Sequence, residues 1–350
     1  MTSRPAIAAA VDPAAGYRAV GRLYNALMTG LVLTLVSQRG ADAAAAYVFA
    51  HFRRQHVEKF LPGLAKLGLD RLPDAMACAQ YHYFSNALGG VKTEYIPESD
   101  RKAWVRYPPP RWIWQGTAIC GIPQKVNEAM LHGWHGHNGV SLGNPRLGFV
   151  CTGQTVAGDP GLEGYYFDYG REIAESERVR FAPEETCPPL DPAAQPALDS
   201  ADWPAERLAK IERAYAVEYL RTMLPVMLDL HGSAEAAALI GRTARLIGLQ
   251  FQDRAAADLG IAGRGPAAFA DLLAGLARAQ GEAVTVRGDG DGVEVAQAGW
   301  RLLQGLEIDP RMALAAWNPL WEGALAAHDR HLRLDTRLDG DGIVWRVGPG

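Results

Sequence analysis

Three histidines lie within six residues of the segment LHGWHGHNG, at His132, His135 and His137. A neutral imidazole can accept a proton from water or bind a divalent metal ion. On a helix His132 and His135 share a face while His137 lies on another side, but the interspersed glycines allow the backbone to bend. The segment therefore predicts a general base, with His135 and His137 as candidates, or a metal site formed by all three.

A metal site is the alternative rather than the favoured hypothesis. Zinc motifs such as HExxH place a glutamate between two histidines one helical turn apart, and this segment has no such glutamate. We therefore predict no bound cofactor, while a divalent metal stays possible. Two other interpretations remain. The histidines could hydrogen-bond in a polar pocket without a metal, or they could have a structural or solvated role.

Cys151 follows LGFV near the end of an expected strand, one turn after the histidine segment. A cysteine nucleophile needs a lowered pKa, which a neighbouring imidazole can supply. Cys151 is therefore a candidate nucleophile. The alternative is a buried thiol that packs as a small hydrophobic group.

Further polar and aromatic residues could hold a substrate. His82, Ser85 and Asn86 share one face of an expected helix. Two arginines flank three prolines ahead of two tryptophans, and a planar guanidinium suits a carboxylate. The candidate substrate-binding residues are His82, Arg106, Arg111, Trp112, Trp114 and Asn138.

The elements that must position these residues occur twice. QRGADAAAAYVFAHF at 38–52 is similar to LHGSAEAAALIGRTA at 230–244, and AKLGLDRLPDAMA at 65–77 to ADLGIAGRGPAAF at 257–269. Gly89 and Gly281 open two hairpins, and all three pairs are 192 residues apart. In each half the sequence pattern predicts helices, a hairpin, a short helix with a tryptophan and a second hairpin, in this order.

This pattern predicts an α+β fold of two tandem repeats, each with helices on one face of a small antiparallel sheet, which form a pseudo-twofold pair. The predicted domains are a first repeat at 14–182, which carries the site, and a supporting second repeat at 205–350. The Pro- and Asp-rich segment 183–204 lacks apolar periodicity and is interpreted as a linker. His135 aligns with Asn318 and His137 with Leu320, so the histidines belong to the first half alone.

Each half resembles the α+β domain shared by the L-2-amino-thiazoline-4-carboxylic acid hydrolase family and the four-vinyl-reductase-type small-molecule-binding domains. The resemblance lies in the Ala-rich helix pair, the hairpin, the turn-rich GNPRLGFVCTGQTVAGDPG and its counterpart NPLWEGALAAHDRHLRLDTRLDGDG, and the closing strands YYFDY and VWRV. It implies a small-molecule pocket and, for the hydrolase branch, opening of a cyclic amidine or thiazoline by water. It assigns no catalytic residue.

Composition narrows the function classes. The net charge is −4, with 35 Lys and Arg against 39 Asp and Glu, which argues against nucleic acid as a partner. Four widely spaced cysteines suit a reducing compartment. The most apolar window, 26–37, is shorter than the roughly 20 residues that span a bilayer. We expect a cytoplasmic protein with a small-molecule substrate, no nucleic-acid or membrane partner, and possible homo-oligomers.

The leading hypothesis is a hydrolase that acts on a C–N bond of a small cyclic amidine or amide-like substrate. His135 or His137 would be the general base on water or on Cys151, and Arg106 would hold a substrate carboxylate. One alternative is a non-catalytic binding protein for an apolar or aromatic ligand, which nine Trp and twelve Tyr favour. The other is a histidine-ligated metalloenzyme.

Overall fold

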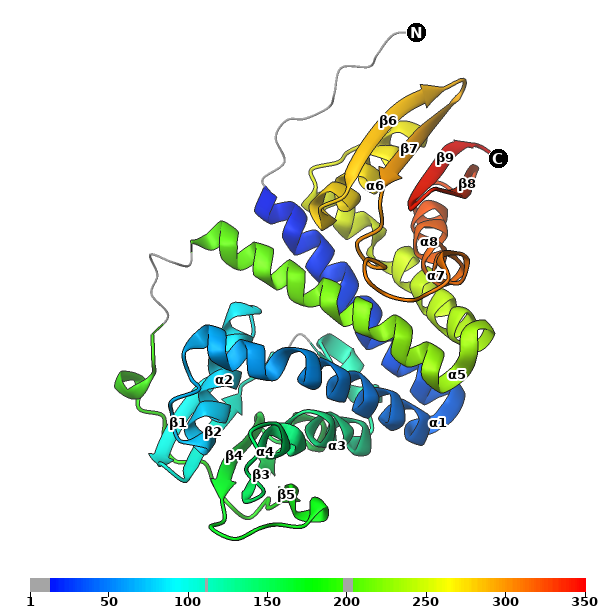
Figure 1. Cartoon of the computed structure of the whole chain (residues 1–350). Helices are drawn as coiled ribbons and strands as arrows, with labels where there is room; N and C mark the ends of the chain where they lie inside the picture. The colour runs from blue at the N-terminus through cyan, green and yellow to red at the C-terminus, as the bar shows by residue number, and fades with distance from the viewer. Residues whose placement is uncertain (1–12, 111–112, 198–203) are drawn as a thin grey trace. The chain divides into compact units, whose positions relative to one another are not determined.

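The computed structural model describes residues 13–110, 113–197 and 204–350 (Figure 1). The fold is α+β, 57% helical and 18% strand, with two sheets that are mainly antiparallel. The chain forms two compact units. Unit 1 contains residues 1–31 and 205–350, and unit 2 contains residues 32–204.

Unit 2 begins inside the long helix α1 (Pro13–Leu67), at residue 32. The other helices of unit 2 are α2 (Asp74–Leu88), α3 (Gln124–Gly133) and α4 (Asn138–Ser141), with a 3-10 turn, η2 (His135–His137), between α3 and α4. Its strands are β1 (Glu94–Ser99), β2 (Lys102–Tyr107), β3 (Leu147–Gly153), β4 (Leu162–Asp168) and β5 (Val179–Phe181).

The sheet of unit 2 has the order β1-β2-β4-β3-β5, and only the β3–β5 pair is parallel. Side chains alternate between its faces. Tyr166 and Phe149 lie opposite each other on the face that packs against α2 and η2. Trp104, Tyr165 and Val150 form a core on the other face. Because both faces are covered, every residue of β3 is buried.

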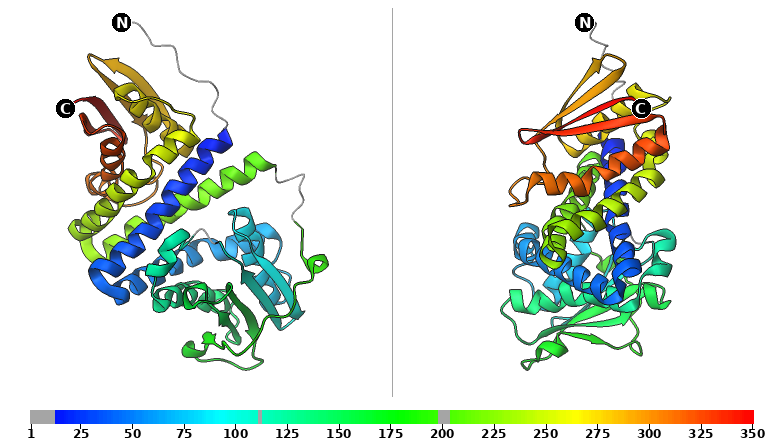
Figure 2. Two further views of the ribbon diagram at one scale, coloured as in Figure 1. Left: turned by 180° about the vertical axis from the view of Figure 1, so that it is seen from behind. Right: turned by 90° about the vertical axis from the view of Figure 1, so that its right-hand side faces the viewer.

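Unit 1 pairs the start of α1 with the helices α5 (Ala205–Asp258), α6 (Pro266–Gln280), α7 (Pro310–Trp317) and α8 (Pro319–His328). Its strands β6 (Ala283–Asp289), β7 (Gly292–Ala298), β8 (Leu332–Asp339) and β9 (Gly342–Pro349) form an antiparallel sheet in the order β6-β7-β9-β8. Helix α6 packs on β6, β7 and β9, as the two views in Figure 2 show. Burial alternates along β8, which leaves one face of that strand in solvent.

The units differ from the predicted domains at both ends of the first repeat. Residues 14–31 were expected in that repeat but pack in unit 1, where Tyr24 contacts Trp317 edge to face and donates to Gln280. Part of the predicted linker also packs. Cys187 and Leu190 cover the outer face of the unit 2 sheet. The sparse apolar residues of this segment were sufficient for burial although they show no periodicity.

The two halves share their order of helices and their first four strands. Helices α2 and α6 begin and end 192 residues apart. Gly68 and Gly260 both end a long helix with positive φ and the same pair of backbone hydrogen bonds, a Schellman motif. The third predicted landmark is displaced, because Gly90 rather than Gly89 has the positive φ that Gly281 has.

Helices α1 and α5 are long and apolar enough to cross a bilayer, by length and composition alone. The most apolar window of α1 is 67% buried inside the protein, and that of α5 is 39% buried. Core helices of water-soluble proteins have the same properties, so these helices do not decide the location of the protein.

Each long helix is kinked at a glycine with backbone angles that other residues rarely adopt. Gly40 has φ 87° and ψ 170°, and Gly232 has φ 72° and ψ 168°. We predict that Gly232→Ala lowers the free energy of unfolding by about 1–3 kcal/mol, the usual cost of such strain. Gly21→Ala is the control, because Gly21 lies within α1 with open space around it and should gain up to about 1 kcal/mol. Urea denaturation of both variants measures this. A shift of the same sign in both would contradict the strain.

Candidate functional site

Unit 2 contains a cluster of aromatic and imidazole side chains between its helices and its sheet. His56 comes from α1, His82 from α2, and Tyr166 from β4. The residues between α3 and α4 supply the others. We call the following residues the histidine cluster: His56, His82, Trp134, His135, His137, Asn138 and Tyr166.

A chain of hydrogen bonds fixes the centre of the cluster. Asn138 Nδ2 donates to the Tyr166 hydroxyl at 3.0 Å, and that hydroxyl lies 2.6 Å from His135 Nδ1. With Asn138 as its donor, the hydroxyl keeps its own proton available for Nδ1. We infer that it donates to Nδ1, which puts the His135 proton on Nε2. In this state Nδ1 is occupied, and Nε2 is a donor rather than a base.

Ring stacking completes the centre. The His82 and His135 rings are parallel, with centroids 4.3 Å apart, and Phe149 contacts His135 at the same distance. Trp134 lies edge-on to both His56 and His82. Two imidazoles at this stacking distance repel each other if both are charged, so the arrangement favours neutral rings.

Several polar atoms of the cluster are buried without a hydrogen-bond partner among the described residues. They are His56 Nδ1, His82 Nε2, Trp134 Nε1, His137 Nδ1 and Asn138 Oδ1. A buried polar atom that lacks a partner costs about 1–3 kcal/mol. Five such atoms in one place call for partners that these side chains do not supply, such as water or a bound molecule.

Burial sets the charge of the cluster. It lowers the pKa of His82 to about 3. Burial first, and then the neighbouring His137, His82 and Arg53, lower the pKa of His56 to about 3 as well. The pKa of His137, which is half-buried, is also lowered, mainly by burial. The imidazoles are therefore neutral at pH 7.

Cys151 lies on β3 but has the wrong surroundings for a nucleophile. Its thiol is buried and donates to the Gly153 carbonyl at 3.5 Å. Burial first, and then the carboxylates of Glu128, Asp159 and Glu163, raise its pKa to about 12. These groups oppose a thiolate, whereas the hypothesis required an imidazole to favour one.

The predicted arginine and tryptophan site is not part of the histidine cluster. Arg106 pairs with Glu94, its cross-strand neighbour, at 2.5 Å. Trp114 is buried and donates to Asn127 at 3.3 Å. Arg111 and Trp112 lie outside the described residues. Arg106 and Trp114 each bind a different residue of unit 2. Although they are close in sequence, these two residues therefore do not form one binding site.

His132 is exposed and lies near Phe181, apart from His135. Within residues 13–110, 113–197 and 204–350 no three His, Cys, Asp or Glu side chains are grouped as metal ligands would be. The helix end turns His135 inward and leaves His132 outside, which is why the three histidines do not converge. His82, His135, His137 and Asn138 do come together.

The sequence analysis missed three residues of the histidine cluster, namely His56, Trp134 and Tyr166, and also Ser141, which lies beside His56. His56 Nε2 and Ser141 Oγ are hydrogen-bonded at 2.9 Å although they are 85 residues apart. One sequence signal was present, because His56 aligns at the 192-residue offset with Gly248 and so is specific to the first half. Nothing in the sequence pairs Tyr166 with His135.

The corresponding place in unit 1 is built differently. Asn318, the counterpart of His135, accepts from Trp345 and Thr336 at 3.1 Å each. Thr336 pairs with Trp345 across the strands as Phe149 pairs with Tyr166, so these two pairs correspond.

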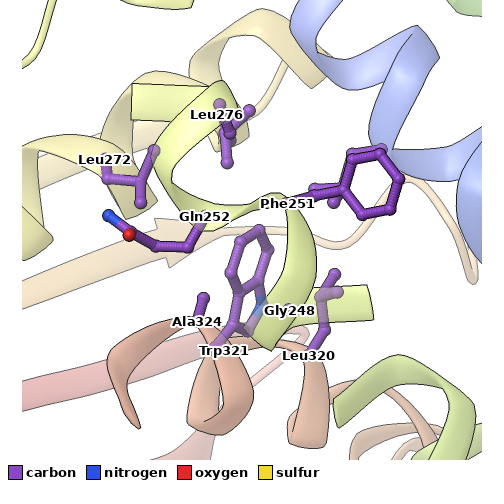
Figure 3. Close-up of a pocket in the computed structure, with 10 residues that line it drawn as sticks. Gly248, Phe251, Gln252, Leu272, Leu276, Leu320, Trp321 and Ala324 are labelled. Atoms are coloured by element: carbon purple, nitrogen blue, oxygen red, sulfur yellow. The ribbon is translucent and has the colours of Figure 1, made fainter. Parts of the chain in front are cut away.

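An apolar cavity of about 10 Å³, enough for about one water molecule, lies beside this place in unit 1. Figure 3 shows Leu320, Trp321 and Ala324 of α8 facing Gly248 of α5 across it. Polar contacts in unit 2 are thus replaced by apolar packing in unit 1.

No protein-family model matches this chain, and comparison with curated proteins finds no match. The functional argument therefore rests on the residues.

We predict that acid destabilises the protein through its buried histidines. Protonation favours the unfolded state, because the pKa of His82 is about 3 when folded and 6.5 when unfolded. Stability is therefore complete above about pH 6.5 and falls as the pH drops from there toward 3. At pH 5 His82 alone should cost about 2 kcal/mol. His82→Phe should remove that part of the loss between pH 7 and pH 5 in urea denaturation, whereas exposed His331→Gln should not. Equal pH dependence in the wild type and His82→Phe would refute the lowered pKa.

We also predict that Cys151 is an inert thiol. The protein has four free cysteines, of which Cys120 is exposed and the others are buried. At pH 8 a thiol reagent such as Ellman's reagent should react first with Cys120. Cys120→Ser should remove the fast phase, and Cys151→Ser should leave it unchanged. A fast phase that disappears in Cys151→Ser would restore the nucleophile hypothesis.

Proposed function

We propose that unit 2 binds a small, uncharged polar molecule at the histidine cluster. The supporting observation is the group of five buried polar atoms that lack partners. They include a donor on Trp134, an acceptor on Asn138 and ring nitrogens of three histidines. A planar molecule with both donors and acceptors, such as a heteroaromatic amide or a lactam, would satisfy several of them at once.

The neutral state of the cluster supports an uncharged ligand. Imidazoles with pKa values near 3 offer no positive charge to an anion at pH 7. The nearest cation, Arg53, uses its guanidinium on the backbone carbonyls of His132 and Gly133. An ion would lose its hydration shell without gaining a counter-charge.

A hydrolase that acts on a C–N bond of a cyclic amidine or amide-like substrate is the second candidate. The observation that favours it is His137, which is half-buried and has an unpaired Nδ1. Water can reach a half-buried ring, so His137 suits the role of general base better than His135, whose Nδ1 is occupied by Tyr166. Cys151 as nucleophile and a histidine-bound metal stay predictions without a supporting contact.

We further propose that the halves arose by tandem duplication, with the site kept in one of them. The 192-residue spacing of the helix kinks and of α2 and α6 supports this, as does the shared strand order. A pseudo-twofold arrangement, a cytoplasmic location, homo-oligomers and the absence of nucleic-acid and membrane partners remain proposals from the sequence.

Binding is tested with a library of small neutral heteroaromatic amides and lactams, using ligand-observed NMR and thermal shift. We expect at least one compound to bind and to lose about tenfold in affinity in His82→Phe, about the worth of one hydrogen bond. His331→Gln is the control, because that histidine is exposed in unit 1. Compounds that bind both variants and the wild type equally would place their site elsewhere and contradict the proposal.

Hydrolysis is tested with 2-amino-thiazoline-4-carboxylic acid by measuring release of the product thiol. If His137 is the base, His137→Ala should lower kcat by about 10²–10⁴, the typical contribution of positioned proton transfer. The same change at exposed His132 is the control. Turnover by the wild type that survives in His137→Ala would exclude His137 as the base.

A further inference from the structure

Ser141, which the proposed binding site does not use, is hydrogen-bonded to His56 at the edge of the histidine cluster. Ser141 Oγ lies 2.9 Å from His56 Nε2. Ser141 is the last residue of α4 and is half-buried, whereas the His56 ring is fully buried in α1. This distance suits transfer of a hydroxyl proton to an imidazole.

His137 is placed beside this pair. It comes four residues before Ser141, and residues 137–141 have helical backbone angles, so the two side chains share a face. The His137 ring is 5.2 Å from the His56 ring and nearly perpendicular to it. Its Nδ1 has no partner among the described residues and can donate a hydrogen bond. The hydroxyl of Ser141, the proton acceptor His56 and the hydrogen-bond donor His137 therefore lie close together.

The His56 ring is neutral in the resting protein, because burial first, and then His137, His82 and Arg53, disfavour its charged form. Nε2 of the neutral ring faces the serine hydroxyl. A proton that the ring accepts must therefore pass on to the leaving group, because the charged ring is not stabilised here.

The three groups occur in unit 2 alone. At the corresponding positions of unit 1, Gly248, Leu320 and Ala324 lie together and line the apolar cavity (Figure 3). A Cβ on Gly248 would clash with the Leu320 carbonyl, so close helix packing there excludes a side chain. The scaffold folds without the polar trio, so folding alone does not require it.

Apolar side chains adjoin the pair. Val57 and Val140, the chain neighbours of His56 and Ser141, are 63% and 42% exposed. Phe60 stacks on the His56 ring at 4.7 Å. An acyl chain could lie on these residues.

We propose that Ser141 is a nucleophile that His56 activates, and that the pair accepts the acyl group of a small uncharged ester or thioester. Ser141 Oγ forms a bond to the carbonyl carbon as its proton moves to His56 Nε2, and His137 donates to the carbonyl oxygen. The bond to the leaving group breaks, and the leaving group takes the proton from His56. Water then attacks the acyl-serine by the same route in reverse and releases the acid.

This inference rests on the proposed small-molecule site, since it uses the edge of the same cluster. The test is reaction with an alkyl fluorophosphonate, in which the Oγ–P bond forms, the P–F bond breaks and fluoride leaves. We expect one adduct per chain by intact mass, located on Ser141 by peptide mapping. Ser141→Ala should abolish the adduct, and His56→Gln should slow its formation at least about 100-fold. Ser99→Ala, at an exposed serine of unit 2, should leave the rate unchanged.

A second measurement needs no variant. The wild-type protein should release p-nitrophenol from p-nitrophenyl butyrate in a burst equal to the protein concentration. The absence of both adduct and burst, or an adduct on another residue, would overturn the proposal. Failure here is distinct from failure of the binding proposal. Suppose that heteroaromatic amides lose affinity in His82→Phe but bind Ser141→Ala as they bind the wild type. The binding site would then be supported although Ser141 is not a nucleophile.

Discussion

The hydrogen bond between Tyr166 and His135 connects the sheet of unit 2 to the turn between α3 and α4, and the site depends on it. Tyr166 is fully buried on β4, and its hydroxyl also accepts from Asn138. The bond restrains the His135 ring, which stacks on His82. Loss of the hydroxyl would remove both hydrogen bonds and loosen the turn that carries His137 and Ser141.

The two halves use one scaffold for different purposes. In each, a residue after a short helix accepts a hydrogen bond from the fourth strand: His135 from Tyr166 in unit 2, and Asn318 from Trp345 in unit 1. Beside this shared contact, unit 2 places imidazoles and a serine, while unit 1 packs aliphatic side chains against a glycine. The same order of elements can therefore hold a similar framework contact in both halves, while the polar side chains beside it differ.

Local signals in the sequence predicted much of this arrangement. Gly68 and Gly260 lie in segments that the sequence aligned 192 residues apart, and both have positive φ; the histidine spacing indicated a polar site around His135 and His137. Features that depend on distant partners could not be predicted. Arg106 looked available for a carboxylate until the strand register placed Glu94 opposite it, and Cys151 looked activated until its carboxylate neighbours were known. His56 joins Ser141 only because the helices pack, which no short motif encodes.

The central claim is that the cluster is neutral, with His135 held in one tautomer by Tyr166. Side-chain ¹⁵N NMR of histidine-labelled protein at pH 7 measures this most directly, with Tyr166→Phe to assign the His135 signals. The account predicts a neutral His135 with its proton on Nε2, and a change in the Nδ1 shift when the hydroxyl is removed. A charged His135, or a neutral one with its proton on Nδ1, would contradict the account.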